Sequence, residues 1–437
     1  MKKSGKVVAA VLCAVLCGAV FTACNDAGDG KCTLLRESAI AEYLSYTERE
    51  NEGYLEISAA AEEFATRFAE AAYSEYDGIG NFAVSPVSVY MALALAAECA
   101  SGETREELLS ALGVSYEHLQ SDFAYLYRSL EREFKTGEVA VGNSVWVNEG
   151  TEVNGGCLDA LAEKYFCDSY SADFAGDNEQ ANLAVRSFVR KLTGGLIDKD
   201  FELSPETLFT LVNVLYLKDA WHSSGDDLSF TDSEISFTEQ SGNVKTRRFL
   251  EGDYLLGRAC ETDTFASFYV RTAYGYKMKF ILPKDGYTAA EVFTAENIAL
   301  ANSVGDYGGT DNVNRVRYFT RCVFPEFGAA YDNDVKGMLS EYFGVNKLFS
   351  KGECELGSLL SDNNATAFCS KVRHVTKLTV DRKGIEGAAA TIIDAPTASD
   401  PGDYEEVYLD FVVDKAFGFV LTDSCDTTMF AGVIGGI

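Results

Sequence analysis

The spacing of apolar and polar residues changes between the two halves of the chain. In the first half, apolar residues recur every three to four positions, which is typical of amphipathic helices. This spacing predicts helices over Leu55–Tyr76, Ser88–Glu98, Thr104–Leu112, Tyr116–Phe134, Cys157–Tyr165 and Asn178–Leu192. Runs rich in β-branched and aromatic residues predict strands over Val139–Val147, Leu208–Leu217, Ala266–Leu282, Arg315–Phe324, Arg373–Val380, Val407–Phe411, Ala416–Thr422 and Thr428–Ile434. Helices followed by strands favour an α+β domain.

A tract of small residues near the C-terminus has an unusual alternation. It consists of Gly384, Ile385, Glu386, Gly387, Ala388, Ala389, Ala390 and Thr391. Laid out as a strand as far as Thr397, its odd-numbered positions carry no charge, and both acidic residues, Glu386 and Asp394, fall on the other face. Small-residue tracts are usually flexible linkers. A solvated linker needs no uncharged face, so the pattern predicts a segment that can enter a sheet.

Several sequence blocks on either side of this tract occur in a recognisable order. They are Asn81–Ser88, Ala92–Leu93, Gly102–Thr104, Leu211–Asn213 with Tyr216, Lys218 and Trp221, Lys277–Pro283, Phe324–Phe327, Ser370–His374, Val380–Asp381, Phe417–Leu421 and Phe430–Gly432. In this order, across about residues 57–437, the chain resembles the serpin family. The tract at Gly384 then corresponds to the glycine–alanine hinge of the serpin reactive loop.

The resemblance implies a serpin-like α+β fold with three β-sheets, about eight or nine helices and an exposed reactive loop at about residues 382–406. It also implies a buried polar network beneath the main sheet, formed by Ser85, Ser88, Asn213 and His374. Such a network must be fully satisfied, and a shift within it could control how easily the sheet opens. For His374 the simpler alternative is a hydrogen-bonded core histidine. Trp221 is expected to pack where the sheet opens.

As the resemblance implies, the protein would be a single-use inhibitor of serine proteases. The protease would form an acyl-enzyme at the loop, which would then enter the sheet as a new strand. Counting from the hinge places the scissile bond at Ala398–Ser399, and a small residue before the cut suits elastase-like or subtilisin-like enzymes. Ile385 departs from the Thr or Ser usual in the family. The alternatives are a non-inhibitory serpin-fold protein and a surface lipoprotein with a binding or storage role.

Composition narrows the possible partners. The 437 residues include 67 acidic and 37 basic ones, a net charge of −30, which argues against nucleic-acid binding. The acidity would aid solubility, or attract cationic partners. With only three histidines and no HExxH, GxSxG, phosphate-binding or CxxC pattern, we expect no catalytic residue, metal or cofactor. The expected partner is a serine protease, bound by a monomer.

The N-terminus resembles a targeting segment. Lys2, Lys3 and Lys6 precede the apolar run Val7–Phe21, whose 15 residues are short for a membrane span of about 20 but suit a secretory signal. The following cysteine, Cys24, resembles the lipidated residue of a bacterial lipobox; the alternative is ordinary signal-peptide cleavage.

We therefore expect a signal peptide over residues 1–23, a flexible tether over 24–54 and the serpin domain over 55–437. The protein would lie outside the cytoplasm, either anchored to the bacterial membrane or surface by lipid, or secreted.

Overall fold

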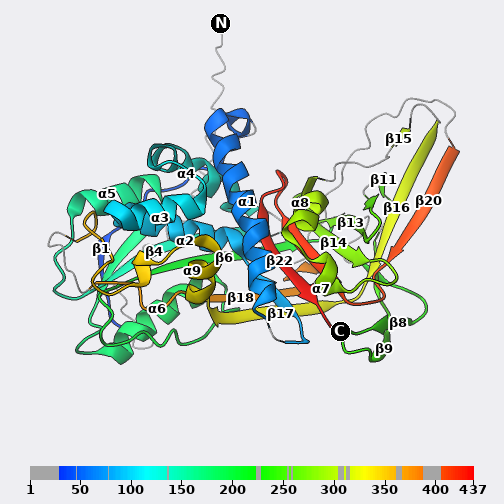
Figure 1. Ribbon diagram of the computed structural model, residues 1–437. Coiled ribbons are helices and arrows are strands. Elements are labelled where there is room, and N and C mark those ends of the chain that lie inside the picture. Colours follow the sequence, from blue (N-terminus) through cyan, green and yellow to red (C-terminus); the bar gives the residue numbers. More distant parts are fainter. Residues whose placement is uncertain are drawn as a thin grey trace, which may run out of the picture.

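The computed structural model describes residues 29–45, 47–76, 78–134, 137–222, 228–252, 255–256, 259–303, 310–311, 315–360, 367–386 and 405–437. Figure 1 shows α1 standing between two parts of the molecule. The helices α2–α6 and the strands they cover lie on one side. On the other side lie strands of the second half of the chain, of which β16 and β20 extend away from the body.

Helices predominate in the first half of the described chain. The helices of the first half are α1 Glu52–Ser74, α2 Pro86–Cys99, α3 Gly102–Leu112, α4 Tyr116–Leu130, α5 Gly155–Lys164 and α6 Asn178–Leu192, with a 3₁₀ turn at Glu48–Glu50. The second half has α7 Ala289–Val292, α8 Ala295–Ser303 and α9 Lys336–Phe343, with a 3₁₀ turn at Lys347–Phe349. Local chemistry sets their ends: the Asn51 side chain accepts the Gly53 N–H at the start of α1, and α3 ends at Gly113, whose φ is 69°. None of these helices is long and apolar enough to cross a membrane.

The strands in the first half are β1 Thr33–Arg36, β2 Phe82–Val84, β3 Arg132–Phe134, β4 Gly137–Asn148, β5 Cys167–Ala172 and β6 Phe209–Ala220. Short strands follow: β7 Ser229–Phe230, β8 Ile235–Thr238, β9 Val244–Arg247, β10 Leu250–Glu251, β11 Leu255–Leu256, β12 Ala259–Glu261 and β15 Thr310–Asp311. The longer late strands are β13 Phe265–Arg271, β14 Lys277–Pro283, β16 Val316–Phe324, β17 Phe327–Asp334, β18 Arg373–Asp381, β20 Glu405–Val412, β21 Phe417–Thr422 and β22 Thr428–Ile434, with the two-residue β19 at Gly384–Ile385.

These strands form three large sheets and the small β8–β9 sheet. The main sheet runs in the order β1-β5-β4-β6-β19-β18-β17, with β3 beside β4. A second has the order β12-β13-β14-β21-β22-β2, and a third joins β11, β16, β10 and β7, with β15 and β20 also beside β16. The prediction of a serpin-like α+β fold with three sheets and about eight or nine helices is confirmed for the described part of the chain.

Two predicted elements differ from the structure. The helix expected over Tyr116–Phe134 ends at Leu130, because the next residues form β3 and pair with β4. The single strand expected over Ala266–Leu282 is the antiparallel pair β13 and β14. Gly275, with a φ of 100°, lies in the turn that reverses the chain between them.

Alternating residues of the main sheet pack into two cores. On one face, Trp146 of β4 and Val212 of β6 pack with α6, where Phe188 lies edge-on to the Trp146 ring. On the other face, the sheet joins the larger core that contains α1, α2 and the second sheet. Both faces are covered by helices, as the mainly hydrophobic β6 would suggest.

The segment predicted as a flexible tether is docked on the domain from residue 29 onwards. Strand β1 extends the main sheet by pairing with β5. Leu44 is fully buried, and its N–H donates to the Arg128 carbonyl oxygen at 2.9 Å. The tether prediction differs from the structure over these residues because their backbone groups and Leu44 find partners on the domain. The predicted signal peptide lies outside the described residues.

Candidate functional site

The main sheet contains a slot between its two central strands. Strand β19 is hydrogen-bonded to β6 on one side and to β18 on the other. It has only two residues, and no ladder joins β6 to β18 directly within the described part of the chain. Ten residues of β6, Phe209–Lys218, therefore face β18 without a strand between them.

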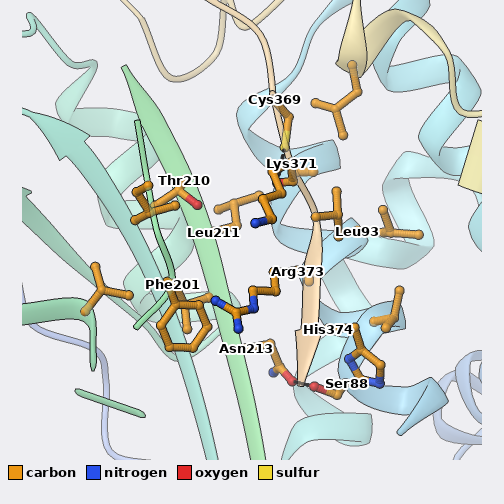
Figure 2. A pocket seen from close by; sticks show the side chains of 18 residues that line it. Ser88, Leu93, Phe201, Thr210, Leu211, Asn213, Cys369, Lys371, Arg373 and His374 are labelled. Carbon is orange, nitrogen blue, oxygen red and sulfur yellow. Dashed lines mark hydrogen bonds between the residues drawn. The ribbon is translucent and has the colours of Figure 1, made fainter. Parts of the chain in front are cut away.

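Cavities follow this slot from end to end. The first, of about 80 Å³, lies where Thr210–Asn213 of β6 face Arg373 and His374, and Ser88 and Leu93 of α2 also line it (Figure 2). A second lies between Asn213–Leu215 and Val375, and a third reaches Glu386 at the β19 end. The volume between the two strands is thus only partly filled by side chains.

Two of the predicted hinge residues, Gly384 and Ile385, form β19. Gly384 pairs with Ala220 of β6, and a Cβ added to it would lie 2.1 Å from the Asp219 carbonyl oxygen. Ile385 pairs with Asp219 and with Val380, and its side chain is fully buried. Glycine is required for the close approach, and the apolar Ile385 fits the core it enters.

Glu386 is the residue at which the chain leaves the sheet. Its N–H still donates to the Thr379 carbonyl oxygen at 2.9 Å, but its φ of 58° is left-handed. The Tyr216 hydroxyl donates to Glu386 Oε1 at 3.4 Å, while Oε2 is buried with no hydrogen-bond partner among the described residues. Burial raises the pKa of this carboxyl, and the positive charges of Lys218 and Lys377 only partly oppose that rise.

His374 and Ser85 form one buried hydrogen-bonded group. The Ser85 N–H donates to His374 Nε2 at 3.0 Å, and the Ser85 hydroxyl donates to the Met429 carbonyl oxygen at 2.8 Å. An accepting Nε2 identifies a neutral imidazole with its proton on Nδ1. Burial lowers the pKa of His374 to about 4, in agreement with this assignment.

Ser88 and Asn213 belong to a second group. The Ser88 hydroxyl donates to Asn213 Oδ1, and Asn213 Nδ2 donates to Asn143 Oδ1 at 2.7 Å. Asn143 in turn donates to the Tyr165 carbonyl oxygen. The sequence analysis missed Asn143, which pairs with Asn213 across β4 and β6 and carries no motif of its own.

The four predicted network residues therefore converge but do not form one chain of hydrogen bonds. Ser88, Asn213 and His374 line the same cavity (Figure 2), yet no hydrogen bond found within the described residues joins the His374 group to the Asn213 group. The slot lies between them. Each group has its own hydrogen bonds, and both are attached to the start of α2 through Ser85 and Ser88.

Trp221 lies at the opposite end of β6, roughly 26 Å from Asn213 along the strand. Its Nε1 donates to the Asp381 carbonyl oxygen at 2.7 Å, and its ring lies edge-on to Phe324. The indole thus holds the turn that leads into the hinge. The indole therefore combines a packing contact with a polar one near the β19 end of the slot.

The other predicted site residues lie outside the described residues. They are the hinge residues Gly387, Ala388, Ala389, Ala390 and Thr391, the reactive-bond residues Ala398 and Ser399, and the lipidation residue Cys24. The described chain resumes at Glu405 in β20, which runs parallel to β16. The proposed reactive bond therefore belongs to the connection from β19 to β20.

Within the described chain, β19 occupies only one end of the gap between β6 and β18. A sequence model described as "Serpin (serine protease inhibitor)" matches residues 59–435. The chain therefore belongs to the serpin family, whose members are generally inhibitors and typically form covalent complexes with serine proteases.

Individual relatives support the assignment. The chain is 25% identical to alpha-1-antitrypsin 1-2 of Mus musculus over 356 residues, which cover 79% of this chain and 83% of that protein. The native thermophilic serpin tengpin has a similar structure, with a TM-score of 0.72, 21% identity and coverage of 93% of this chain and 100% of its own. Thyroxine-binding globulin in complex with thyroxine has a TM-score of 0.70 and 19% identity, over 87% and 99% of the chains. These two structures establish the fold.

Proposed function

We propose that this protein is a single-use inhibitor that traps a serine protease as its acyl-enzyme. The protease serine would attack the carbonyl carbon of Ala398 and form an ester. The peptide bond to Ser399 would break, and the proton from the protease serine hydroxyl would go to the new amino terminus at Ser399. The freed loop would then fill the slot and carry the attached protease with it, before water could hydrolyse the ester.

The observation that carries this proposal is the strand-wide slot with β19 already in place at one end. Because residue 385 faces Asp219 and Val380, the same register would place Thr391 opposite both Asn213 and His374. The Thr391 hydroxyl would then lie between the two hydrogen-bonded groups that the slot now separates. Insertion would supply the strand that the sheet lacks and join these groups.

The inward face of the loop supports the same conclusion. Positions 387, 389, 391, 393 and 395 would follow Ile385 on that face, and none is charged. Residues 386–395 would lie beside the ten open positions of β6. Each inserted residue would gain about 1 kcal/mol from ladder hydrogen bonds. The sum is comparable to the roughly 5–15 kcal/mol of a whole domain's stability, enough to distort a protease.

The protease class follows from Ala398. A methyl side chain before the cut suits enzymes with shallow pockets, such as elastase-like or subtilisin-like proteases. The test is denaturing gel electrophoresis after mixing the protein with an elastase-like enzyme, which should yield a covalent complex. The variant Ala398→Arg should lose that complex and form one with a trypsin-like enzyme.

The same gel separates the alternatives. Clean cleavage near residue 398 without a complex would indicate a non-inhibitory serpin. Random degradation would mean that the protein does not engage these proteases through its loop. Either result would contradict the proposed inhibitory function.

The proposed location is outside the cytoplasm, with Cys24 as a lipid anchor. The support is the charged and apolar pattern of the first residues. Replacement of the thiol in Cys24→Ala should release the protein from membranes or block its maturation. Detergent partitioning of the variant identical to that of the wild type would contradict the anchor.

A further inference from the structure

We propose that Glu56, His118 and Asp122 form a binding site for a divalent transition-metal ion, with Zn²⁺ as the best fit. One carboxylate or imidazole ligand atom from each residue lies within 4.8 Å of the other two. Glu56 belongs to α1, whereas the other two belong to α4. A bound ion would therefore join two helices that are distant in sequence.

The positions on the helices explain the convergence. His118 and Asp122 are one turn apart on α4 and so share a face of that helix. Glu56 reaches this face from α1, and its Oε2 lies 3.0 Å from His118 Nδ1. No sequence motif marks the set, because Glu56 is far from the α4 pair along the chain.

Gly53 in the first turn of α1 makes room for the third ligand. A Cβ at residue 53 would lie 2.5 Å from Asp122 Oδ1 and 2.7 Å from its Cγ. Real Cβ atoms do not approach that closely, so any other residue at position 53 would move the Asp122 carboxylate. Replacing Gly53 by alanine therefore changes the position of the Asp122 carboxylate without removing it.

The charges also favour a cation. Glu56 and Asp122 bring two carboxylates together, and within the described chain Asp122 makes no hydrogen bond or ion pair. The His118 side chain contacts Glu56 and can offset one negative charge at most. A divalent ion would offset both.

The donor set selects the kind of ion. One imidazole nitrogen with two carboxylates suits Zn²⁺ and its neighbours, whereas Mg²⁺ and Ca²⁺ prefer oxygen ligands alone. Tetrahedral Zn²⁺, with bonds of about 2.0–2.2 Å, needs donor atoms roughly 3.4 Å apart. The ligand atoms lie up to 4.8 Å apart without an ion. Because Glu56 and His118 are about half exposed, small rotations of their side chains can bring the ligand atoms to the shorter spacing. Water would supply the fourth ligand.

The experiment is calorimetric titration of the intact protein with ZnCl₂, with MgCl₂ as a comparison. We expect one Zn²⁺ site whose affinity falls at least about tenfold in His118→Ala and in Asp122→Asn. Glu117→Gln, an equal charge change on the same helix outside the cluster, should leave it unchanged. A hundredfold excess of Zn²⁺ over Kd should raise the melting temperature of the wild type by about 3 °C.

Two further variants make the test specific. Gly53→Ala should weaken Zn²⁺ binding, whereas Gly155→Ala in the first turn of α5, where a Cβ would meet no atom within 4 Å, should not. Cys425→Ser controls for an exposed thiol that could bind Zn²⁺ by itself. The proposal is overturned if the wild type binds no Zn²⁺, if His118→Ala binds it equally well, or if binding disappears only in Cys425→Ser.

Discussion

The side chain at position 385 should decide whether the protein inhibits a protease or is merely cleaved by it. Ile385 is fully buried and lies directly opposite Asp219, which is also fully buried. Directly opposite side chains in an antiparallel pair have Cβ atoms about 5 Å apart. In Ile385→Glu, two carboxylates would therefore meet in the core. In Ile385→Arg, the guanidinium could pair with Asp219. Ile385→Arg should therefore impair inhibition less than Ile385→Glu, although its side chain is larger.

The magnitude follows from two contributions. Loss of the buried isoleucine costs about 2 kcal/mol. Repulsion between unit charges 5 Å apart adds about 3 kcal/mol at an effective dielectric constant of 20. Because Ile385 is already buried in β19 of the intact protein, this total of about 5 kcal/mol should first displace the hinge from the slot. If half of it is present at the barrier when the displaced hinge inserts again, the loop inserts roughly 60-fold more slowly. Hydrolysis of the ester should then overtake insertion.

The assay is the yield of covalent complex per cleaved inhibitor, measured with an elastase-like protease. Ile385→Val, which keeps an apolar β-branched side chain, should trap about as well as the wild type. Ile385→Arg should trap less well, and Ile385→Glu should be cut at the same bond with little complex. If Ile385→Glu traps as efficiently as Ile385→Val, the assignment of this residue to the inserting hinge is wrong.

Three further predictions concern groups around the slot. Because burial raises the pKa of Glu386, docking of the hinge in the slot should be strongest in acid and should weaken as pH rises above the ordinary pKa of 4.5. Protection of the Glu386 amide from hydrogen exchange should fall over the same pH range, and Glu386→Gln should abolish this pH dependence. The pKa of His374, lowered from 6.5 to about 4, should cost up to about 3 kcal/mol of stability as pH falls through that window; urea unfolding should lose this dependence in His374→Gln, and an unchanged slope would contradict it. Trp221→Phe, which removes the bond to the Asp381 carbonyl oxygen, should lower the unfolding free energy by about 1 kcal/mol; no change in urea midpoint would show that the bond contributes nothing.

The sequence predicted an uncharged face at Ile385 from a local pattern, and it predicted the residues beneath the sheet from the resemblance. The alternation around Ile385 required an uncharged face, and that side chain is indeed buried. Ser85, Ser88, Asn213 and His374 could be grouped by resemblance and do converge on the slot. Their division into two hydrogen-bonded groups could not be predicted, because it depends on the spacing between β6 and β18.

Other features depend on contacts between distant segments. Strand β1 could not be predicted because its four residues are too few to show a period, and they gain a partner only when β5 is in place. Glu386 is partly buried because it directly follows the two residues of β19 that pair with β6 and β18. The number of residues that pair in this way cannot be inferred from the spacing of apolar residues. Asn143 and Tyr216 belong to ordinary strand patterns, and their contacts with Asn213 and Glu386 arise from pairing across the sheet.

The most direct test of the account is the melting temperature of the loop-cleaved protein against that of the intact protein. Filling the slot adds ten residues to the sheet at about 1 kcal/mol each. With an unfolding entropy of about 2.1 cal/mol/K per residue over roughly 380 residues, the melting temperature should rise by roughly 12 °C. Calorimetry at matched concentration should show this rise after cleavage near Ala398. Equal melting temperatures for the two forms would contradict insertion of the loop into the main sheet.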